Sequence, residues 1–191
     1  MQELIYIHGF NSSPQSQKAQ DTARWLAAHH PKARLQIPAL SHDPEATLVL
    51  LEKTVKNCHY APGLIGSSMG GFYATVLAER FGLRAVLINP AVHPHRLLTK
   101  YLGENRNYHT GEAYELESRH VDVLRSQEVQ TIHHPERLWV LLQTADETLD
   151  YRQAVSYYAG CPQDIVEGGS HAYENYVERL PEIYAFLKTS N

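Results

Sequence analysis

The sequence predicts an α/β protein: a three-layer α/β/α sandwich around a mostly parallel, doubly wound sheet of about six strands. First, short β-branched or apolar runs alternate with longer helical patterns along the chain. Second, these runs are almost continuously apolar, which is typical of parallel strands covered on both faces. Third, the chain has 191 residues, 43% of them hydrophobic and 20% charged, so it suits one domain with a sizeable core.

The elements follow from reading this pattern in order. The predicted strands are "LIYIH" (4–8), "ARLQIP" (33–38), "GLIGS" (63–67), "AVLIN" (85–89), "LWVLLQT" (138–144) and "DIVEG" (164–168). The predicted helices lie near 15–29, 43–58, 70–81, 151–159 and 173–188, the second of them only imperfectly periodic. With no internal repeat or linker, the alternation predicts a single domain over residues 1–191.

One interval interrupts the alternation. Between residues 91 and 135 the pattern predicts no strand, and the segment mixes "PHRLLTKYLG" with "YHTGEAYELESRHVDVLRSQEV". Such a stretch is too long for a plain connection in a compact domain. We therefore expect a helical insertion that forms a lid or cap over one end of the sheet.

Composition narrows the kinds of partner and location. The net charge is −4 and Lys and Arg form no run, so nucleic acid is not expected as the main partner. Cys58 and Cys161 are too few for a disulfide framework or a metal cluster, and we expect two free thiols. No apolar stretch approaches the ~18–20 residues of a membrane span. The N-terminus has a strand pattern rather than a leader pattern, so we expect a cytoplasmic protein. The oligomeric state stays open.

The stretch "GSSMGG" joins a predicted strand to a predicted helix. Only one register matches G-x-S-x-G, and it makes Ser68 the candidate nucleophile, between Gly66 and Gly70. A serine on a sharp strand-to-helix turn leaves no room for side chains two positions away, which explains the glycines. The following helix would also direct its positive end at a developing anion. The alternative is a glycine turn with a passive serine.

A nucleophilic serine needs a base, and the base needs an acid that fixes its tautomer. On a doubly wound sheet these partners follow later strands, in the order Ser, acid, His. Asp146 comes directly after the strand "LWVLLQT", with Glu147 and Asp150 as alternatives. Because Asp150 stands where the next helix begins, we expect it to be an N-cap. His171 lies in the glycine-rich loop after the last strand.

The other histidines are expected to have structural or solvated roles. His8, in "HG" at the end of the first strand, is expected to be structural rather than catalytic. His93 and His95 lack carboxylate or thiol ligands at the usual spacings, so we expect no metal. We expect His29, His30, His133 and His134 to lie at the solvated ends of helices or loops.

Two backbone amides are expected to form an oxyanion hole. One is the amide that follows the nucleophile, Met69, and the other comes from the loop after the first strand, "HGFNSSP". In that loop Gly9 allows close backbone approach, and Phe10 supplies the second N–H.

Several stretches together resemble one family. They are "YIHGFNSSPQSQKA", "GLIGSSMGGFYAT", "LINPAVHP", "YLGENRNYHTGEAYELESRHVDVL", "DETLDYRQAVSYYA" and "EGGSHA". This set resembles the YqiA-like family of small bacterial esterases, with an α/β-hydrolase fold, over nearly the whole chain. The resemblance implies a carboxylic-ester hydrolase without cofactor, in which Ser68, Asp146 and His171 form the triad. Ala145 and Ser170 depart from the expected Gly and Asn beside the acid and the base.

The sequence therefore predicts a serine esterase that acts on a small-molecule ester by an acyl-enzyme mechanism. An acyl-CoA thioesterase with the same triad is the alternative, because the resemblance makes thioesters plausible too. Residues 91–137 carry six Lys or Arg against seven acidic residues, which is no clear phosphate-binding patch. A catalytically silent hydrolase fold used for binding is a further alternative of a different class. The acyl chain and the leaving group stay open.

Overall fold

The computed structural model describes residues 2–108 and 110–188. Its main sheet has six strands in the order β2-β1-β3-β4-β7-β8, and every neighbouring pair is parallel. All six predicted strands are confirmed, and no bound differs from its prediction by more than two residues. They are β1 (Glu3–Ile7), β2 (Arg34–Gln36), β3 (Gly63–Ser67), β4 (Ala85–Ile88), β7 (Leu138–Gln143) and β8 (Gln163–Val166).

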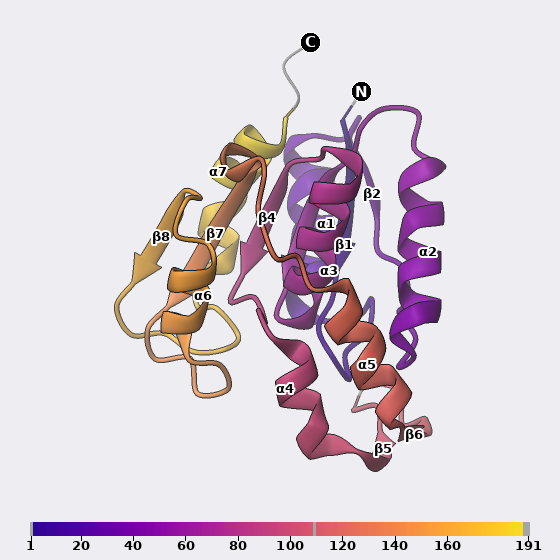
Figure 1. Cartoon of the computed structure of the whole chain (residues 1–191). Helices are drawn as coiled ribbons and strands as arrows, with labels where there is room; N and C mark the ends of the chain where they lie inside the picture. The colour runs from indigo at the N-terminus through magenta and orange to yellow at the C-terminus, as the bar shows by residue number, and fades with distance from the viewer. Residues whose placement is uncertain (1, 109, 189–191) are drawn as a thin grey trace.

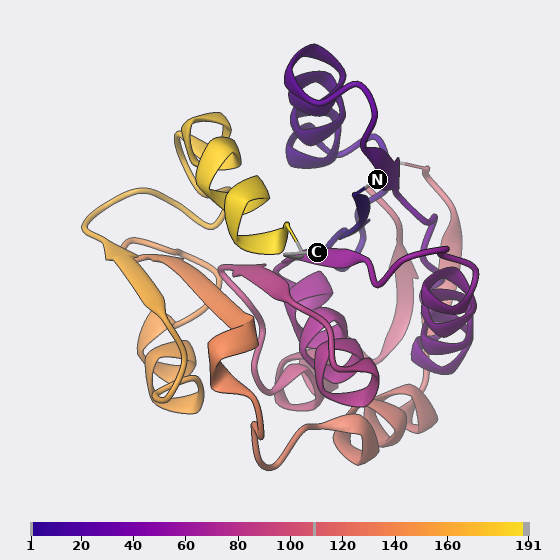
Figure 2. The same ribbon diagram turned by 90° about the horizontal axis from the view of Figure 1, so that it is seen from above.

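Helices cover both faces of this sheet, as predicted (Figure 2). One face is covered by α1 (Gln17–His29) and α7 (Tyr176–Leu187), which pack against each other. The other face is covered by α2, α3, α5 and α6, which span Pro44–Lys56, Met69–Phe81, Ser118–Gln127 and Tyr151–Tyr157. The result is a three-layer α/β/α sandwich that presents the carboxyl ends of all six strands at one edge.

The core consists of two apolar clusters, one on each face of the sheet. In β1, Ile5 and Ile7 belong to the cluster under α3, while Leu4 and Tyr6 belong to the cluster under α1 and α7. Successive side chains of a strand point to opposite faces, so a strand buried on both sides must be apolar throughout. This is why the sequence shows continuous apolar runs rather than alternation.

The last helix begins later than predicted. The pattern indicated a helix from residue 173, whereas α7 begins at Tyr176. Tyr173 and Asn175 adopt φ angles of 60° and 59°, in the left-handed region, where a right-handed helix cannot continue. The additional residues instead extend the loop that carries His171.

The prediction that residues 91–135 hold no strand is wrong. This segment contains α4 (Pro94–Leu98), the 3₁₀ turn η1 (Thr99–Tyr101) and α5, but also β5 (Gly103–Arg106) and β6 (Ala113–Leu116). The two strands form an antiparallel hairpin, with Gly103 opposite Leu116. Each strand has only four residues and carries charged side chains, so neither shows an apolar run. The hairpin lies at the end of the molecule away from the two termini (Figure 1), and its role as a lid stays a prediction.

Two further predictions concern membranes and thiols. Within the described residues, no helix is both long and apolar enough to cross a membrane. Cys58 and Cys161 are both free thiols, as expected.

Candidate active site

Ser68 stands on a sharp turn between β3 and α3. Its φ and ψ angles are 56° and −120°, a conformation that costs a non-glycine residue about 1–3 kcal/mol. Backbone hydrogen bonds hold the turn: the Ser68 amide donates to the Ile88 carbonyl at 3.0 Å, and the Gly71 amide donates to the Ser68 carbonyl at 2.9 Å. The strand–turn–helix setting predicted for "GSSMGG" is therefore present.

The glycines around Ser68 are required by close backbone contacts. A Cβ atom on Gly66 would lie 2.4 Å from the Gly70 carbonyl oxygen. One on Gly70 would lie 1.9 Å from the carbonyl oxygen of Ile7 in β1. Both distances are far below van der Waals contact, and the atoms met are backbone atoms that cannot rotate away. The steric reason given for this motif is therefore correct.

The structure brings Ser68, His171 and Asp146 together from three separate loops at the carboxyl ends of the strands. His171 Nε2 lies 3.0 Å from Ser68 Oγ. On the other side of the ring, His171 Nδ1 lies 2.8 Å from Asp146 Oδ2 and 3.0 Å from Oδ1. Such an arrangement fixes the tautomer with the proton on Nδ1, so that Nε2 accepts from the serine hydroxyl.

Asp146 is held as a carboxylate. Its side chain is only 2% exposed, and Oδ1 also accepts from the backbone amides of Thr148 and Leu149, each at 2.8 Å. Burial by itself raises the pKa of this carboxyl. The hydrogen bonds from His171 and the two amides outweigh burial, so the pKa of Asp146 lies below its ordinary value. Asp146 is therefore ionised at neutral pH.

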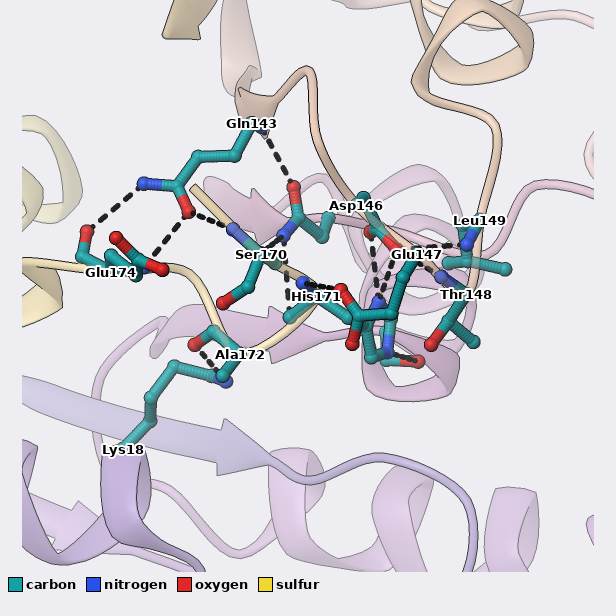
Figure 3. A network of polar contacts seen from close by, with 12 residues as sticks. Lys18, Gln143, Asp146, Glu147, Thr148, Leu149, Ser170, His171, Ala172 and Glu174 are labelled. Atoms are coloured by element: carbon teal, nitrogen blue, oxygen red, sulfur yellow. Dashed lines mark hydrogen bonds and ion pairs between the residues drawn. The ribbon is translucent and has the colours of Figure 1, made fainter. Parts of the chain in front are cut away.

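The two alternative acids, Asp150 and Glu147, accept hydrogen bonds from backbone amides. Asp150 is the N-cap of α6 and accepts from the Arg152 amide at 3.0 Å, as predicted. Glu147 Oε2 accepts the backbone amide of His171 at 2.9 Å, and this bond lowers the pKa of Glu147 (Figure 3). Glu147 thus contacts the histidine's backbone, whereas Asp146 contacts its imidazole.

Two buried amide side chains that the sequence analysis missed fix the loop of His171. Gln143, at the end of β7 and 3% exposed, accepts the amides of Ser170 and Glu174 at 3.0 and 2.8 Å and donates to the Glu174 carbonyl at 3.0 Å (Figure 3). Asn89, directly after β4, donates to the Ser170 and His171 carbonyls at 3.0 and 3.3 Å. The sequence held one signal for these two residues: each stands at the end of a predicted strand that is otherwise apolar.

The loop after β1 lies directly against the nucleophile. A Cβ atom on Gly9 would lie 3.3 Å from Ser68 Cβ and 3.8 Å from its Oγ. Phe10 follows in this loop, and Met69 is the first residue of α3. Among the described residues, no acceptor takes the backbone N–H of either Phe10 or Met69. Two backbone amides, that of Met69 directly after the serine and that of Phe10 in the loop that lies against it, are therefore unused within the described residues.

A wide cavity of about 720 Å³ opens onto Ser68 and His171. Lys18 of α1 lies at its edge and donates to the Ala172 carbonyl at 2.8 Å, which ties the helix to the histidine loop (Figure 3). Burial lowers the pKa of Lys18, although Asp146 and Asp21 oppose this shift. The cavity gives a substrate access to the hydroxyl and the imidazole from the side of α1 and α7.

The remaining histidines have other contacts. His8 is 3% exposed; its Nδ1 lies 3.0 Å from the Gly9 carbonyl, and its Nε2 accepts the Leu40 amide at 3.3 Å, which suits a structural role. His93 Nδ1 and His95 Nδ1 each lie 3.0 Å from a different oxygen of Glu128, a carboxylate that the sequence spacing did not reveal. Within the described chain, no three His, Cys, Asp or Glu side chains are grouped to hold a metal ion.

With this geometry in place, comparison with known proteins identifies the family. The model of a family described as "Uncharacterised protein family (UPF0227)" matches residues 3–188. The chain belongs to this family. A UPF0227 protein from Shewanella sp. (strain ANA-3) is 25% identical over 190 residues, covering 96% of this chain and 98% of the relative. One from Shewanella oneidensis is 28% identical over 142 residues, covering 65% and 78%. The family resemblance seen in the sequence is thereby confirmed.

Solved structures confirm the α/β-hydrolase fold. Est1E from Butyrivibrio proteoclasticus, with ferulic acid bound, superposes with a TM-score of 0.73 at 15% identity, covering 97% of this chain and 88% of that one. The esterase domain of a Rhodothermus marinus protein gives a TM-score of 0.70 at 16% identity, covering 97% and 85%. At these identities the similarity establishes the fold alone.

Proposed function

We propose that this protein is a serine hydrolase that cleaves carboxylic esters through an acyl-enzyme, with Ser68 as nucleophile, His171 as general base and acid, and Asp146 as the acid that orients it. The observation that carries the proposal is the continuous chain of contacts from the Ser68 hydroxyl through His171 to the buried Asp146, with distances of 3.0 and 2.8 Å. The strained backbone of Ser68 supports the same conclusion, because such strain persists where function requires it.

In the first step, Ser68 Oγ attacks the ester carbonyl carbon while His171 Nε2 takes its proton. The Asp146 carboxylate stabilises the imidazolium that forms, through the Nδ1–H bond. The carbonyl oxygen becomes an oxyanion, for which the amides of Phe10 and Met69 are the donors. Each such donor contributes roughly 3–4 kcal/mol to transition-state stabilisation in well-studied hydrolases.

In the second step, His171 gives its proton to the departing alcohol, and the acyl group stays on Ser68. Water then enters from the wide cavity, and His171 removes its proton as the water oxygen attacks the acyl carbon. The bond from this carbon to Ser68 Oγ breaks, His171 returns the proton to Ser68 Oγ, and the carboxylic acid leaves. Every proton moves between Ser68, His171, water and the leaving group. A thioester would follow the same steps with a thiol as leaving group.

Hydrolysis of short-chain p-nitrophenyl esters and of a long-chain acyl-CoA, with wild type and Ser68→Ala side by side, tests the proposal. We expect the wild type to turn over the esters and to take a fluorophosphonate label, and Ser68→Ala to lose both. The ratio of ester to thioester turnover ranks the two leaving groups. If the wild type is inactive and unlabelled, the serine is not activated, and a binding role for the fold becomes the better explanation.

A further inference from the structure

A second, smaller cavity borders the same loop on the side away from His171. Its volume is about 120 Å³, and Gly9, Phe10 and Met69 form its inner end. Its outer part comes from the segment after β2 and from the hairpin β5–β6, including His42, Asn107 and Tyr114. The residues that line it include neither Ser68 nor His171, whereas both line the wide cavity. The two cavities thus meet at the candidate oxyanion hole.

Tyr73 gives this small cavity an unused polar group. The residue lies on α3, lines the cavity, and is only 4% exposed. Its hydroxyl makes no hydrogen bond within the part of the chain that the structure describes. Two other buried tyrosines are paired: the Tyr158 hydroxyl with Thr75 and the Tyr176 hydroxyl with Thr22, both at 2.8 Å. The Tyr73 hydroxyl is not one of the fully enclosed side-chain atoms that lack a hydrogen bond, so it opens onto the cavity and is available to a ligand there.

The chemistry of the triad decides which part of an ester enters which cavity. His171 must protonate the leaving alcohol, so the alcohol has to lie on the side of His171, in the wide cavity. With its oxygen between the amides of Phe10 and Met69, the carbonyl then directs its acyl group to the other side. That side is the small cavity. This step rests on the function proposed above.

We propose that the small cavity is the acyl subsite, that it takes a short acyl group bearing a hydroxyl or a similar hydrogen-bonding group, and that the Tyr73 hydroxyl recognises this group. The volume sets the size: an engineered protein cavity of about 150 Å³ holds one benzene molecule, so about 120 Å³ accommodates roughly four to six non-hydrogen atoms. The alcohol side, at about 720 Å³, admits a much larger group.

The hairpin β5–β6 fixes the outer wall of this subsite. The Tyr114 hydroxyl donates to Asn11 Oδ1 at 2.5 Å, and Asn107 Nδ2 donates to the Ser12 carbonyl at 3.1 Å. Burial raises the pKa of Tyr114 to about 12, although its bond to Asn11 lowers it, so the hydroxyl stays a donor at neutral pH. The imidazole of His42 stacks on the Tyr114 ring with centroids 4.4 Å apart. In this proposal the hairpin, which these bonds tie to the loop of Phe10, forms the outer wall of the acyl subsite.

The test compares esters that share one leaving group. Wild-type kcat/KM is measured for p-nitrophenyl butyrate, 3-hydroxybutyrate and decanoate, each divided by its spontaneous hydrolysis rate. We expect the hydroxylated ester to exceed butyrate by about three- to tenfold, the effect of one neutral hydrogen bond. We expect decanoate to fall at least about tenfold below butyrate, because its chain exceeds the cavity.

Tyr73→Phe removes only the hydroxyl. We expect it to lower the ratio of 3-hydroxybutyrate to butyrate turnover by about three- to tenfold. Tyr158→Phe is the matched control, because it removes a buried hydroxyl that also packs against α3 but lines neither cavity. It should leave this ratio at the wild-type value. Should Tyr73→Phe fail to fold, the wild-type ranking of the three esters decides by itself.

The outcomes separate the two proposals. Equal turnover of butyrate and decanoate, or no preference for the hydroxylated ester, overturns the acyl subsite while serine-dependent hydrolysis stands. An unchanged ratio in Tyr73→Phe overturns the role of that hydroxyl. A wild type that cleaves none of the three esters and takes no fluorophosphonate label overturns the proposed function, and the subsite with it.

Discussion

The Gln143 side chain holds the histidine loop by three hydrogen bonds, and replacing it tests whether this support matters for activity. Gln143→Leu keeps a side chain of similar size but leaves the Ser170 and Glu174 amides and the Glu174 carbonyl without their partner. The loop cannot relax freely, because Gly168, Gly169 and Tyr173 all adopt positive φ angles. We therefore expect His171 to be displaced rather than simply less well supported.

The magnitude follows from the number of bonds. At about 1 kcal/mol for each lost hydrogen bond, and somewhat more for donors left unpaired, Gln143→Leu should lose about 2–4 kcal/mol of unfolding free energy. For a chain of this size that corresponds to roughly 4–16 °C in Tm. If His171 moves by about 1 Å relative to Ser68, turnover should fall about 10²-fold.

Gln163→Leu is the matched control. Gln163, at the start of β8, donates to the carbonyls of Val155 and Tyr158 at 3.1 and 2.6 Å, so its loss also removes bonds from a partly buried glutamine. Among the described residues, its side chain makes no hydrogen bond to the histidine loop. We expect a comparable loss of stability, about 1–3 kcal/mol by the same reasoning, with turnover close to wild type.

Urea unfolding followed by circular dichroism measures the stability of both variants. Turnover of p-nitrophenyl butyrate, at a temperature where both are fully folded, measures the effect on chemistry. If both variants lose turnover equally, the effect is general destabilisation. If Gln143→Leu keeps wild-type turnover, contacts other than Gln143 fix His171, and our reasoning about the loop is refuted.

Two further predictions concern the turn and the acid. Gly70→Ala would place a Cβ atom 1.9 Å from the Ile7 carbonyl oxygen, so we expect it to lower the free energy of unfolding by about 3 kcal/mol or more and to abolish fluorophosphonate labelling. Gly160→Ala is the control, because the nearest atom to its new Cβ lies at 3.6 Å. Thermal denaturation should show this control to be neutral or slightly stabilising. Because the pKa of Asp146 is lowered in the folded state, its carboxylate contributes stability that is complete above its ordinary value of about 3.9 and is lost as the pH falls. The difference in unfolding free energy between wild type and Asp146→Asn should therefore shrink below about pH 4. A difference that grows on acidification would contradict this sign.

The sequence by itself determined the layers of the fold and the members of the candidate triad. Continuous apolar runs are a local signal, and they located all six strands of the main sheet. Ser68, Asp146 and His171 each follow such a run, so their meeting at one edge of the sheet could be inferred from chain order alone. The glycine pairing around Ser68 was equally local, because the clashes it avoids are inherent in a strand-to-helix turn.

Only the tertiary structure decided what supports and borders this site. The hairpin β5–β6 has no apolar run and is tied to the loop of Phe10 by the bond from Tyr114 to Asn11, across 103 residues of sequence. The Gln143 backbone amide donates to the Asn89 side chain across 54 residues of sequence, and no periodic pattern in the sequence predicts this bond. In the sequence, nothing distinguishes Tyr73 from the apolar positions of its predicted helix. That this residue lines a cavity follows from the elements packed around it, which a local pattern cannot encode.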